Sequence, residues 1–250
     1  MSKLQALIFD VDGTLADTER DGHRISFNRA FAEAGLDWEW SVELYGKLLS
    51  VTGGKERILH YIEQYLPGFT RPEPLKEFIA GLHFAKTKHY VELLAEGGIP
   101  LRPGVKRLLS EAKAAGLRLA IATTTTPANV TALLESVLPE GQSWFEVIGA
   151  GDIVPAKKPA PDIYDYVLKE MQLSPEQCIA FEDSRQGLRS SLGAHLKTIV
   201  TVNSYTAQQE FTDAALVVDQ IGEPDSPFTV LSGNVGTKTY LDLELVRSLF

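Results

Sequence analysis

The chain contains 250 residues, of which 44% are apolar and 23% are charged. This composition is typical of a soluble globular protein with one large or two smaller domains. The net charge of −9 argues against a nucleic acid or an anionic membrane as the main partner, because a polyanion would repel the protein. The single cysteine, Cys178, lies in an apolar run and is expected to be a buried core residue. The sequence shows no signal peptide and no membrane-spanning segment, so we expect a cytoplasmic protein.

The first predicted strand, residues 7–9, ends in two carboxylates, Asp10 and Asp12. Side chains at positions i and i+2 of an extended chain point to the same side, and Gly13 lets the chain turn sharply after them. Two acids this close repel each other, and a bound cation would relieve the repulsion. The carboxyl end of a parallel strand is also a common ligand-binding position. The alternative is a strand end capped by turn-forming Asp and Gly residues.

Residues 17–96 carry apolar residues at helical spacing and no convincing strand. We expect helices at 17–35, 41–49, 55–65 and 73–94. From residue 103 the pattern alternates. Helices are expected at 105–115, 127–138, 162–171 and 186–192, and strands at 118–122, 147–150, 178–181, 197–202 and 216–218. The pattern after Gln220 is less clear, apart from a terminal helix expected at 241–249.

Strands that alternate with helices in this way indicate an α/β fold, a doubly wound parallel sheet with helices on both faces. The helical block interrupts that series directly after the first strand. We therefore expect a core of residues 1–16 and 97–250 and an inserted all-helical cap domain of residues 17–96. Because the insertion starts beside Asp10 and Asp12, the cap would lie over them and could act as a lid.

Three later strand ends also carry polar groups. The strand at 118–122 is followed by four threonines, residues 123–126, whose hydroxyls and amides at a helix start could bind an anion. A lysine pair, residues 157–158, precedes a Pro-rich helix start. The strand at 178–181 ends in Glu182 and Asp183, a place where charge suggests a nearby cation. The alternatives are a threonine helix cap, solvated lysines and a helix cap formed by Asp183 or Ser184.

The order and spacing of these groups resemble the signature of the haloacid dehalogenase (HAD) superfamily. The matching motifs are Asp10-x-Asp12-Gly-Thr, Thr123, Lys158-Pro159 and Glu182-Asp183. The stretches 158–162 and 182–184 are most similar to the beta-phosphoglucomutase-like branch. The resemblance implies a Rossmann-like α/β core with a small helical cap and a Mg²⁺-dependent phosphoryl-transfer activity.

The resemblance also implies a role for each motif residue. Asp10 would attack the phosphoryl group and form an aspartyl-phosphate, while Asp12 would act as the general acid and base. Mg²⁺ would be held by Asp10, the backbone carbonyl of Asp12 and Asp183, with Glu182 in or next to the coordination shell. Lys158 would add positive charge beside the phosphate. The remaining groups would hold the phosphate oxygens: Thr123 and backbone amides near Thr124.

The cap is expected to choose the substrate. Glu19 and His23 share a helix face at positions i and i+4. A second possible anion site combines a hydroxyl, free amides at a helix start and two cations; its residues are Thr52, Gly53, Gly54, Lys55 and Arg57. His83 and Lys86 would add positive charge on the next helix. The alternative is a capped helix with solvated basic residues.

The cap resembles that of the CbbY-type sugar-bisphosphate phosphatases, in residues 52–57 and in Asp37-Trp38-x-Trp40. This resemblance implies removal of the 1-phosphate of a sugar bisphosphate, xylulose 1,5-bisphosphate, to give xylulose 5-phosphate. The two phosphates of such a ligand would explain two anion sites. We therefore expect a small-molecule sugar bisphosphate as the substrate, and a monomeric enzyme.

Two other functions remain open from the sequence. The first is a beta-phosphoglucomutase. By straight count the cap-hinge histidine of such mutases falls on Gly22, although a one-residue shift in the helix would bring His23 to that position. An arginine that binds the mutase's second phosphate has no match in register, because Gly53 stands there. The second is a non-catalytic phosphosugar-binding protein on the same scaffold, since a fold does not fix a function.

Overall fold

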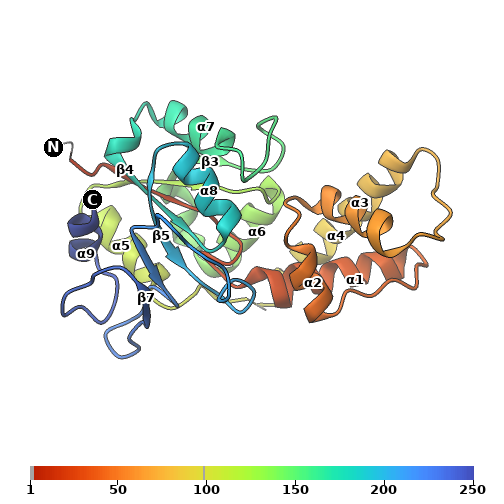
Figure 1. Ribbon diagram of the computed structural model, residues 1–250, viewed down its shortest axis with the longest axis horizontal. Coiled ribbons are helices and arrows are strands. Elements are labelled where there is room, and N and C mark those ends of the chain that lie inside the picture. The colour runs from red at the N-terminus through yellow and green to blue at the C-terminus, as the bar shows by residue number, and fades with distance from the viewer. Residues whose placement is uncertain (1–2, 98) are drawn as a thin grey trace.

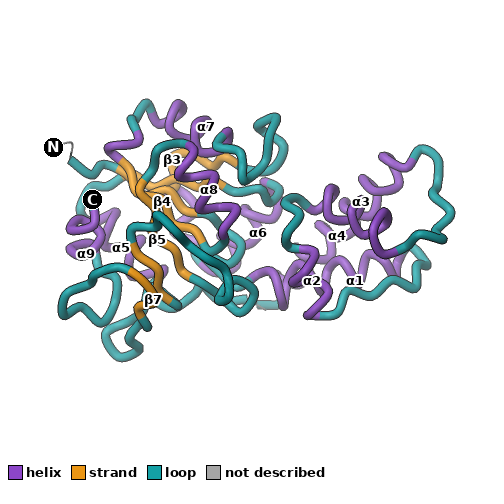
Figure 2. The backbone as a smooth tube through the Cα atoms, in the orientation of Figure 1, coloured by secondary structure: helices purple, strands orange, loops and turns teal. Residues whose placement is uncertain are grey.

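A seven-stranded sheet with the order β3-β2-β1-β4-β5-β6-β7 forms the centre of the computed structural model, which describes residues 3–97 and 99–250 (Figures 1 and 2). The strands are β1 Ala6–Phe9, β2 Arg118–Ala122, β3 Phe145–Gly149, β4 Cys178–Glu182, β5 Lys197–Thr201, β6 Leu216–Val218 and β7 Val230–Ser232. Neighbouring strands are parallel, except that β7 pairs antiparallel with β6. β1 lies in the middle, with Ile8 opposite Ala120 of β2 and Ala180 of β4. The strands that follow β1 in the chain lie on both sides of it, β2 and β3 on one side and β4 to β7 on the other. The carboxyl end of β1 is therefore the switch point at which open α/β sheets bind ligands.

Helices cover both faces of the sheet. They are α5 Val105–Ala114, α6 Pro127–Val137, α7 Asp162–Met171, α8 Arg185–Gly193 and α9 Leu243–Leu249, with short 3₁₀ turns at Pro139–Trp144 and Pro175–Gln177. Side chains of α5, α6 and α9 share one apolar cluster with the sheet, whereas α7 and α8 belong to clusters built on the other strand residues. The expected doubly wound sheet is therefore present. Among the described residues, no helix is long and apolar enough to cross a membrane.

A second, all-helical region lies between β1 and α5 in the chain and beside the sheet-containing part in space (Figure 1). Its helices are η1 Glu19–His23, α1 Arg24–Glu33, α2 Val42–Leu48, α3 Gly54–Tyr65 and α4 Leu75–Ala95. It has a hydrophobic cluster of its own, rich in aromatic rings; Phe27 and Trp40, for example, lie 4.6 Å apart between ring centroids. The chain leaves and re-enters the sheet-containing part side by side, because Ala16 and Leu101 pair in a β-bridge.

Three local features differ from the expectation. η1 is a π-helix, in which the amide of Arg24 donates to the carbonyl of Glu19. β3 begins at Phe145, two residues before the predicted strand, directly after a 3₁₀ turn. β7 was not predicted at all. Its three residues are exposed, so it carries none of the buried apolar pattern by which strands are found in a sequence.

Candidate active site

Four strand ends bring their polar groups to one place, because β1 lies between β2 and β4. Asp10 follows β1, Thr123 follows β2, Lys158 comes from the loop after β3, and Glu182 and Asp183 end β4. All five side chains are buried. Ser184, the next residue, caps α8 by accepting a hydrogen bond from the amide of Gly187. Of the two residues considered as the cap of this helix, Ser184 is the cap, and the Asp183 carboxylate is free to face the other acids.

Lys158 joins two of these carboxylates. Its Nζ lies 2.7 Å from Asp10 Oδ1 and 2.6 Å from Glu182 Oε1. Burial raises the pKa of Asp10 to about 7, against the opposing effect of Lys158. Burial alone would lower the pKa of Lys158, but the charges of Asp10 and Glu182 raise it above its usual value. Lys158 is therefore a permanent cation at this site and not a solvated surface lysine.

The acids outnumber the cation. Ligand oxygens of Asp10, Glu182 and Asp183 lie within 4.8 Å of one another. Burial and the two neighbouring acids raise the pKa of Asp183 well above its ordinary range, although Asn203 Nδ2 donates to its Oδ2 at 2.7 Å. Among the described residues, the buried Oε2 of Glu182 has no hydrogen-bond partner. Three carboxylates thus share one lysine, and one of their oxygens is buried without a partner. A hard divalent cation fits such a site, because it would supply the missing positive charge.

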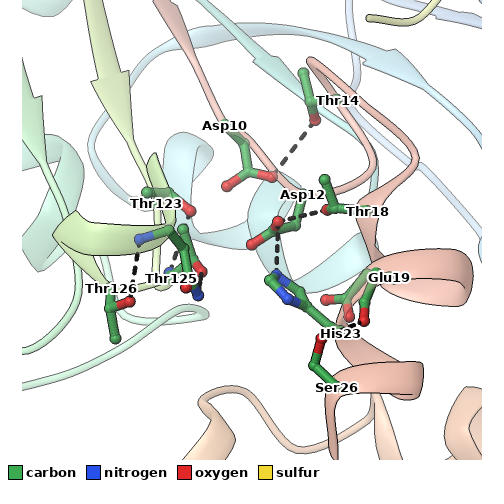
Figure 3. A network of polar contacts seen from close by, with 12 residues as sticks. Asp10, Asp12, Thr14, Thr18, Glu19, His23, Ser26, Thr123, Thr125 and Thr126 are labelled. Atoms are coloured by element: carbon green, nitrogen blue, oxygen red, sulfur yellow. Dashed lines mark hydrogen bonds and ion pairs between the residues drawn. The ribbon is translucent and has the colours of Figure 1, made fainter. Parts of the chain in front are cut away.

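Asp12 has a separate set of partners (Figure 3). Its Oδ1 accepts from the Thr18 hydroxyl at 2.5 Å and lies 2.8 Å from His23 Nε2. The other ring nitrogen, Nδ1, lies 2.9 Å from Lys86 Nζ. An ammonium group can only donate, so Nδ1 accepts, and Nε2 carries the hydrogen that is donated to Asp12. Burial alone would raise the pKa of Asp12, but His23 and Thr18 hold it well below its usual range.

The π-helix explains why His23 reaches Asp12. One extra residue is wound into the turn Glu19–His23, and this wide turn carries His23 to Asp12. Gly22 packs instead against the neighbouring helix. A Cβ atom at Gly22 would lie 2.6 Å from Ile99 Cδ1 and 2.9 Å from Tyr90 Cε2. His23 also lies against the ring of Tyr90, with 4.2 Å between centroids.

Two cavities lie between the helical region and the sheet edge. The larger has a volume of about 360 Å³ and contains the strand-end groups together with Thr52. The smaller, about 50 Å³, is lined by most of the predicted cap residues: His23, Gly53, Gly54, Lys55, His83 and Lys86. Four predicted residues line both cavities and form the wall between them: Asp12, Glu19, Arg57 and Thr124. The sequence-predicted residues are thus brought together, but in two compartments.

Arg57 lies in that wall and is buried. Its Nη1 donates to the hydroxyl of Tyr45 at 2.9 Å, and this hydroxyl donates to Glu19 Oε2 at 2.5 Å. The Nε atom of Arg57 is buried without a partner among the described residues. An unpartnered guanidinium nitrogen beside both cavities suits an anionic ligand group. No sequence pattern pointed to Tyr45, which looks like an ordinary core aromatic residue.

Two of the predicted cap residues contact the sheet-containing part. The Thr52 hydroxyl donates to the side-chain amide of Gln186, and Gln186 donates back to the carbonyl of Ser50. Lys55 Nζ lies 2.5 Å from Asp152 Oδ2. These contacts hold the start of α3 against the sheet-containing part.

One expectation about charge is wrong. Burial, together with the nearby Lys86, lowers the pKa of His83 to about 3. The ring is therefore neutral near pH 7 and adds no positive charge to the small cavity. Burial also lowers the pKa of Lys86, but only to about 8, so Lys86 stays mostly protonated.

The sheet order, the acid–lysine cluster and the helical insertion together define a hydrolase of phosphate esters with a haloacid dehalogenase-like fold. The model of the haloacid dehalogenase-like hydrolases matches residues 4–194, and the chain belongs to this family. The chain is accordingly a phosphoric monoester hydrolase of this family. A non-catalytic binding protein is therefore no longer an alternative.

The chain is 50% identical to the plasmid protein CbbY of Cupriavidus necator over 90% of this chain and 88% of that protein. Its structure is similar to a crystal structure of CbbY from Rhodobacter sphaeroides in complex with phosphate, with 48% identity, a TM-score of 0.82 and 87% and 94% of the two chains covered. An Asp-to-Asn variant of that CbbY, in complex with xylulose-(1,5)bisphosphate, matches at 47% identity with a TM-score of 0.81 and the same coverage. A beta-phosphoglucomutase from Clostridium difficile shares the fold, with a TM-score of 0.70 at 22% identity, over 87% of this chain and 91% of that one.

Proposed function

We propose that the protein is a Mg²⁺-dependent phosphatase that removes the 1-phosphate of xylulose 1,5-bisphosphate and releases xylulose 5-phosphate. The observation that carries the proposal is the buried Asp10, held by Lys158 beside two further acids at the wall of the larger cavity. The choice of sugar is supported by the relative of 47% identity that was crystallised with xylulose-(1,5)bisphosphate.

In this proposal the reaction has two steps. Asp10 attacks phosphorus, the bond from phosphorus to the sugar oxygen breaks, and Asp12 gives a proton to the leaving alkoxide. Water then attacks the phosphorus of the aspartyl-phosphate while Asp12 takes the proton of that water. The bond from phosphorus to the Asp10 oxygen breaks, inorganic phosphate leaves, and Asp10 is regenerated. Mg²⁺, held by Asp10, Asp183 and the Asp12 carbonyl with Glu182 beside it, would neutralise the phosphate charge. Lys158 and Thr123 would hold phosphate oxygens from the other side.

His23 and Lys86 keep Asp12 in the ionised form that the second step needs. The Lys86–His23 contact fixes the imidazole hydrogen on Nε2, which donates to the Asp12 carboxylate. Asp12 is then an ionised base aimed at the cavity. The proton that Asp12 takes from water in the second step is the proton that the leaving alkoxide receives in the first step of the next turnover.

The small cavity would take the second phosphate of the substrate. Lys55, Lys86 and Arg57 line it, together with the threonine segment before α6. The shared wall formed by Glu19, Arg57 and Thr124 would then contact the sugar between the two phosphates. Residues 17–96 would act as a cap domain that closes over the bound sugar and excludes water.

A beta-phosphoglucomutase is the second candidate. The contact between His23 and Asp12 favours it, because this histidine takes the place that a straight count assigned to Gly22. The absence of an arginine at position 53 argues against it, and the nearest cap arginine, Arg57, lies one helical turn further along the chain.

The test is phosphate release from a panel of sugar phosphates and bisphosphates, with Mg²⁺ and with a chelator. We expect release from xylulose 1,5-bisphosphate, abolition by the chelator, and a loss in Asp10→Asn on the order of 10⁴-fold or more. Asp10→Asn that retains activity would contradict the mechanism. Conversion of glucose 1-phosphate to glucose 6-phosphate, primed by a bisphosphate, would establish the mutase instead.

A further inference from the structure

The two oxygens of the Glu182 carboxylate have unequal surroundings. Oε1 accepts hydrogen bonds from Lys158 Nζ at 2.6 Å and from the hydroxyl of Tyr164 at 2.5 Å. Oε2 has no partner among the described residues. Gly187 leaves the space that Oε2 occupies, because a Cβ atom at Gly187 would lie 1.8 Å from it. The carboxylate is therefore held in one orientation, with Oε1 towards the lysine.

Tyr164 is the donor that the proposed chemistry leaves without a role. It comes from the first turn of α7 and is completely buried. It belongs to the same apolar cluster as Ile8 of β1 and Ala180 of β4, and Lys158 Nζ lies 5.3 Å from its ring centroid. Tyr164 thus links the apolar interior to the charged site. Burying a hydroxyl is favourable only if it finds a partner, and the partner here is the acid that shares Lys158 with Asp10.

Lys158 Nζ contacts both Asp10 and Glu182, at the nearly equal distances of 2.7 Å and 2.6 Å. Without the Tyr164 hydroxyl, Oε1 would have the lysine as its only donor, and a carboxylate with an unmet acceptor would draw the ammonium group towards itself. The ammonium group would then move away from Asp10 and from the phosphate beside it. Among the described residues, the hydroxyl of Tyr164 donates to Glu182 and has no hydrogen bond to Asp10, and Tyr164 lines neither of the two cavities. Its contact with the site therefore passes through Glu182.

We propose that Tyr164 is a positioning residue for the phosphatase reaction: its hydroxyl fixes the Glu182 carboxylate so that Lys158 stays on Asp10. The proposal rests on the proposed function only through the role of Asp10 in phosphate ester hydrolysis, and it does not depend on which sugar is bound. It concerns a group on the apolar side of the site, in a cluster that contains none of residues 17–96.

The test is Tyr164→Phe, which removes one oxygen and keeps the packing of the ring. Tyr166→Phe is the matched control, because Tyr166 is a half-buried tyrosine of the same helix that packs against the same apolar cluster. Both variants and the wild type are assayed at saturating Mg²⁺ on xylulose 1,5-bisphosphate and on p-nitrophenyl phosphate. Circular dichroism at the assay temperature confirms that each protein is folded.

We expect kcat of Tyr164→Phe to fall about tenfold with KM within about twofold, and Tyr166→Phe to match the wild type. A crystal structure of metal-free Tyr164→Phe should show Lys158 Nζ beyond hydrogen-bond distance of Asp10. An unchanged kcat, an equal loss in Tyr166→Phe, or a lower kcat with the Lys158–Asp10 contact unchanged would each overturn the proposal. If the wild type hydrolyses only p-nitrophenyl phosphate, the proposed substrate is wrong, and the effect of Tyr164 is still measured on that ester.

Discussion

Two adjacent lysines of one loop show how differently the two charged regions of this molecule are built. Lys158 is 6% exposed and bridges two buried acids at the sheet edge. Lys157 reaches the surface, where it pairs with Glu56 of α3 at 2.8 Å and with Asp152 at 3.1 Å, both of them well exposed. Buried pairs lose a great deal when one partner is removed, whereas exposed pairs contribute little each. The buried cluster around Lys158 suits catalysis, which needs groups held in fixed positions. The exposed pairs around Lys157 suit a contact that can open and close.

The largest effect is expected from Lys158→Met. Kcat should fall by about 10³-fold or more, because a phosphoryl-transfer site depends on charge neutralisation. The metal-free variant should also lose about 3 kcal/mol of unfolding free energy near pH 8, since Asp10 and Glu182 are left with an uncompensated charge. Urea denaturation measures this loss. Lys157→Met is the control and should change both quantities little; equal effects of the two substitutions would show that the regions do not differ.

A smaller effect is expected in the helical region from Lys86→Met. This change removes the donor to His23 Nδ1, so the imidazole hydrogen is no longer held on the nitrogen that faces Asp12. We expect kcat to fall by about 10²-fold, the lower range for loss of general acid–base catalysis. Lys88→Met is the matched control, because Lys88 lies on the same helix with an exposed side chain, 3.9 Å from Glu92. A pH–rate profile of Lys86→Met that superposes on the wild-type profile would contradict the role given to Lys86.

His83 provides a prediction about pH. Its folded-state pKa of about 3 lies below the ordinary histidine pKa of 6.5, so the unfolded chain binds the proton more readily. Stability from the neutral ring is complete above about pH 6.5 and is lost as the pH falls towards 3. At pH 5 the loss should be about 2 kcal/mol, measured as the change in unfolding free energy from pH 7.5. His83→Asn should lose less over the same interval; an equal loss would mean that His83 is not the group responsible.

The smallest effects are expected at the surface contact. Glu56→Lys or Lys157→Glu alone should weaken closure of the helical region and raise KM a few-fold, because each pair is worth about 1 kcal/mol or less. The double variant should recover most of the loss, and 0.5 M NaCl should reduce all the differences, since salt screens exposed charges. Single and double variants with equal KM values would show that this contact does not influence binding.

The sequence was sufficient for six of the seven strands, β1 to β6, and for the polar groups at the strand ends. Each strand that carries Asp10, Thr123 or Glu182 is a buried apolar run, and the polar residue after it is conspicuous for that reason. Asn203 obeys the same rule after β5 and could have been found in the same way. Thr18 and Gln186 gave no such signal, because their roles depend on contacts between distant segments.

Three features of the site could not be predicted from sequence patterns, for physical reasons. Tyr45 and Tyr164 look like core aromatic residues, and only the direction of their hydroxyls reveals a polar role. The charge of His83 depends on how deeply its ring is buried, and the residues around it in the sequence do not reveal that burial. The division of the predicted cap residues between two cavities depends on how the two regions meet, since Asp12, Glu19, Arg57 and Thr124 form a wall that belongs to both.

The π-helix at Glu19–His23 has a consequence for how such chains change in length. A helix that absorbs one extra residue in a single wide turn leaves everything before and after it in place. Deletion of Asp21, on the exposed side of that turn, should therefore let an ordinary helical turn form while His23 still meets Asp12. A gap or an insertion near this turn is then nearly silent in the active site. Related chains that differ by one residue here should be aligned on the histidine, not on the residue count.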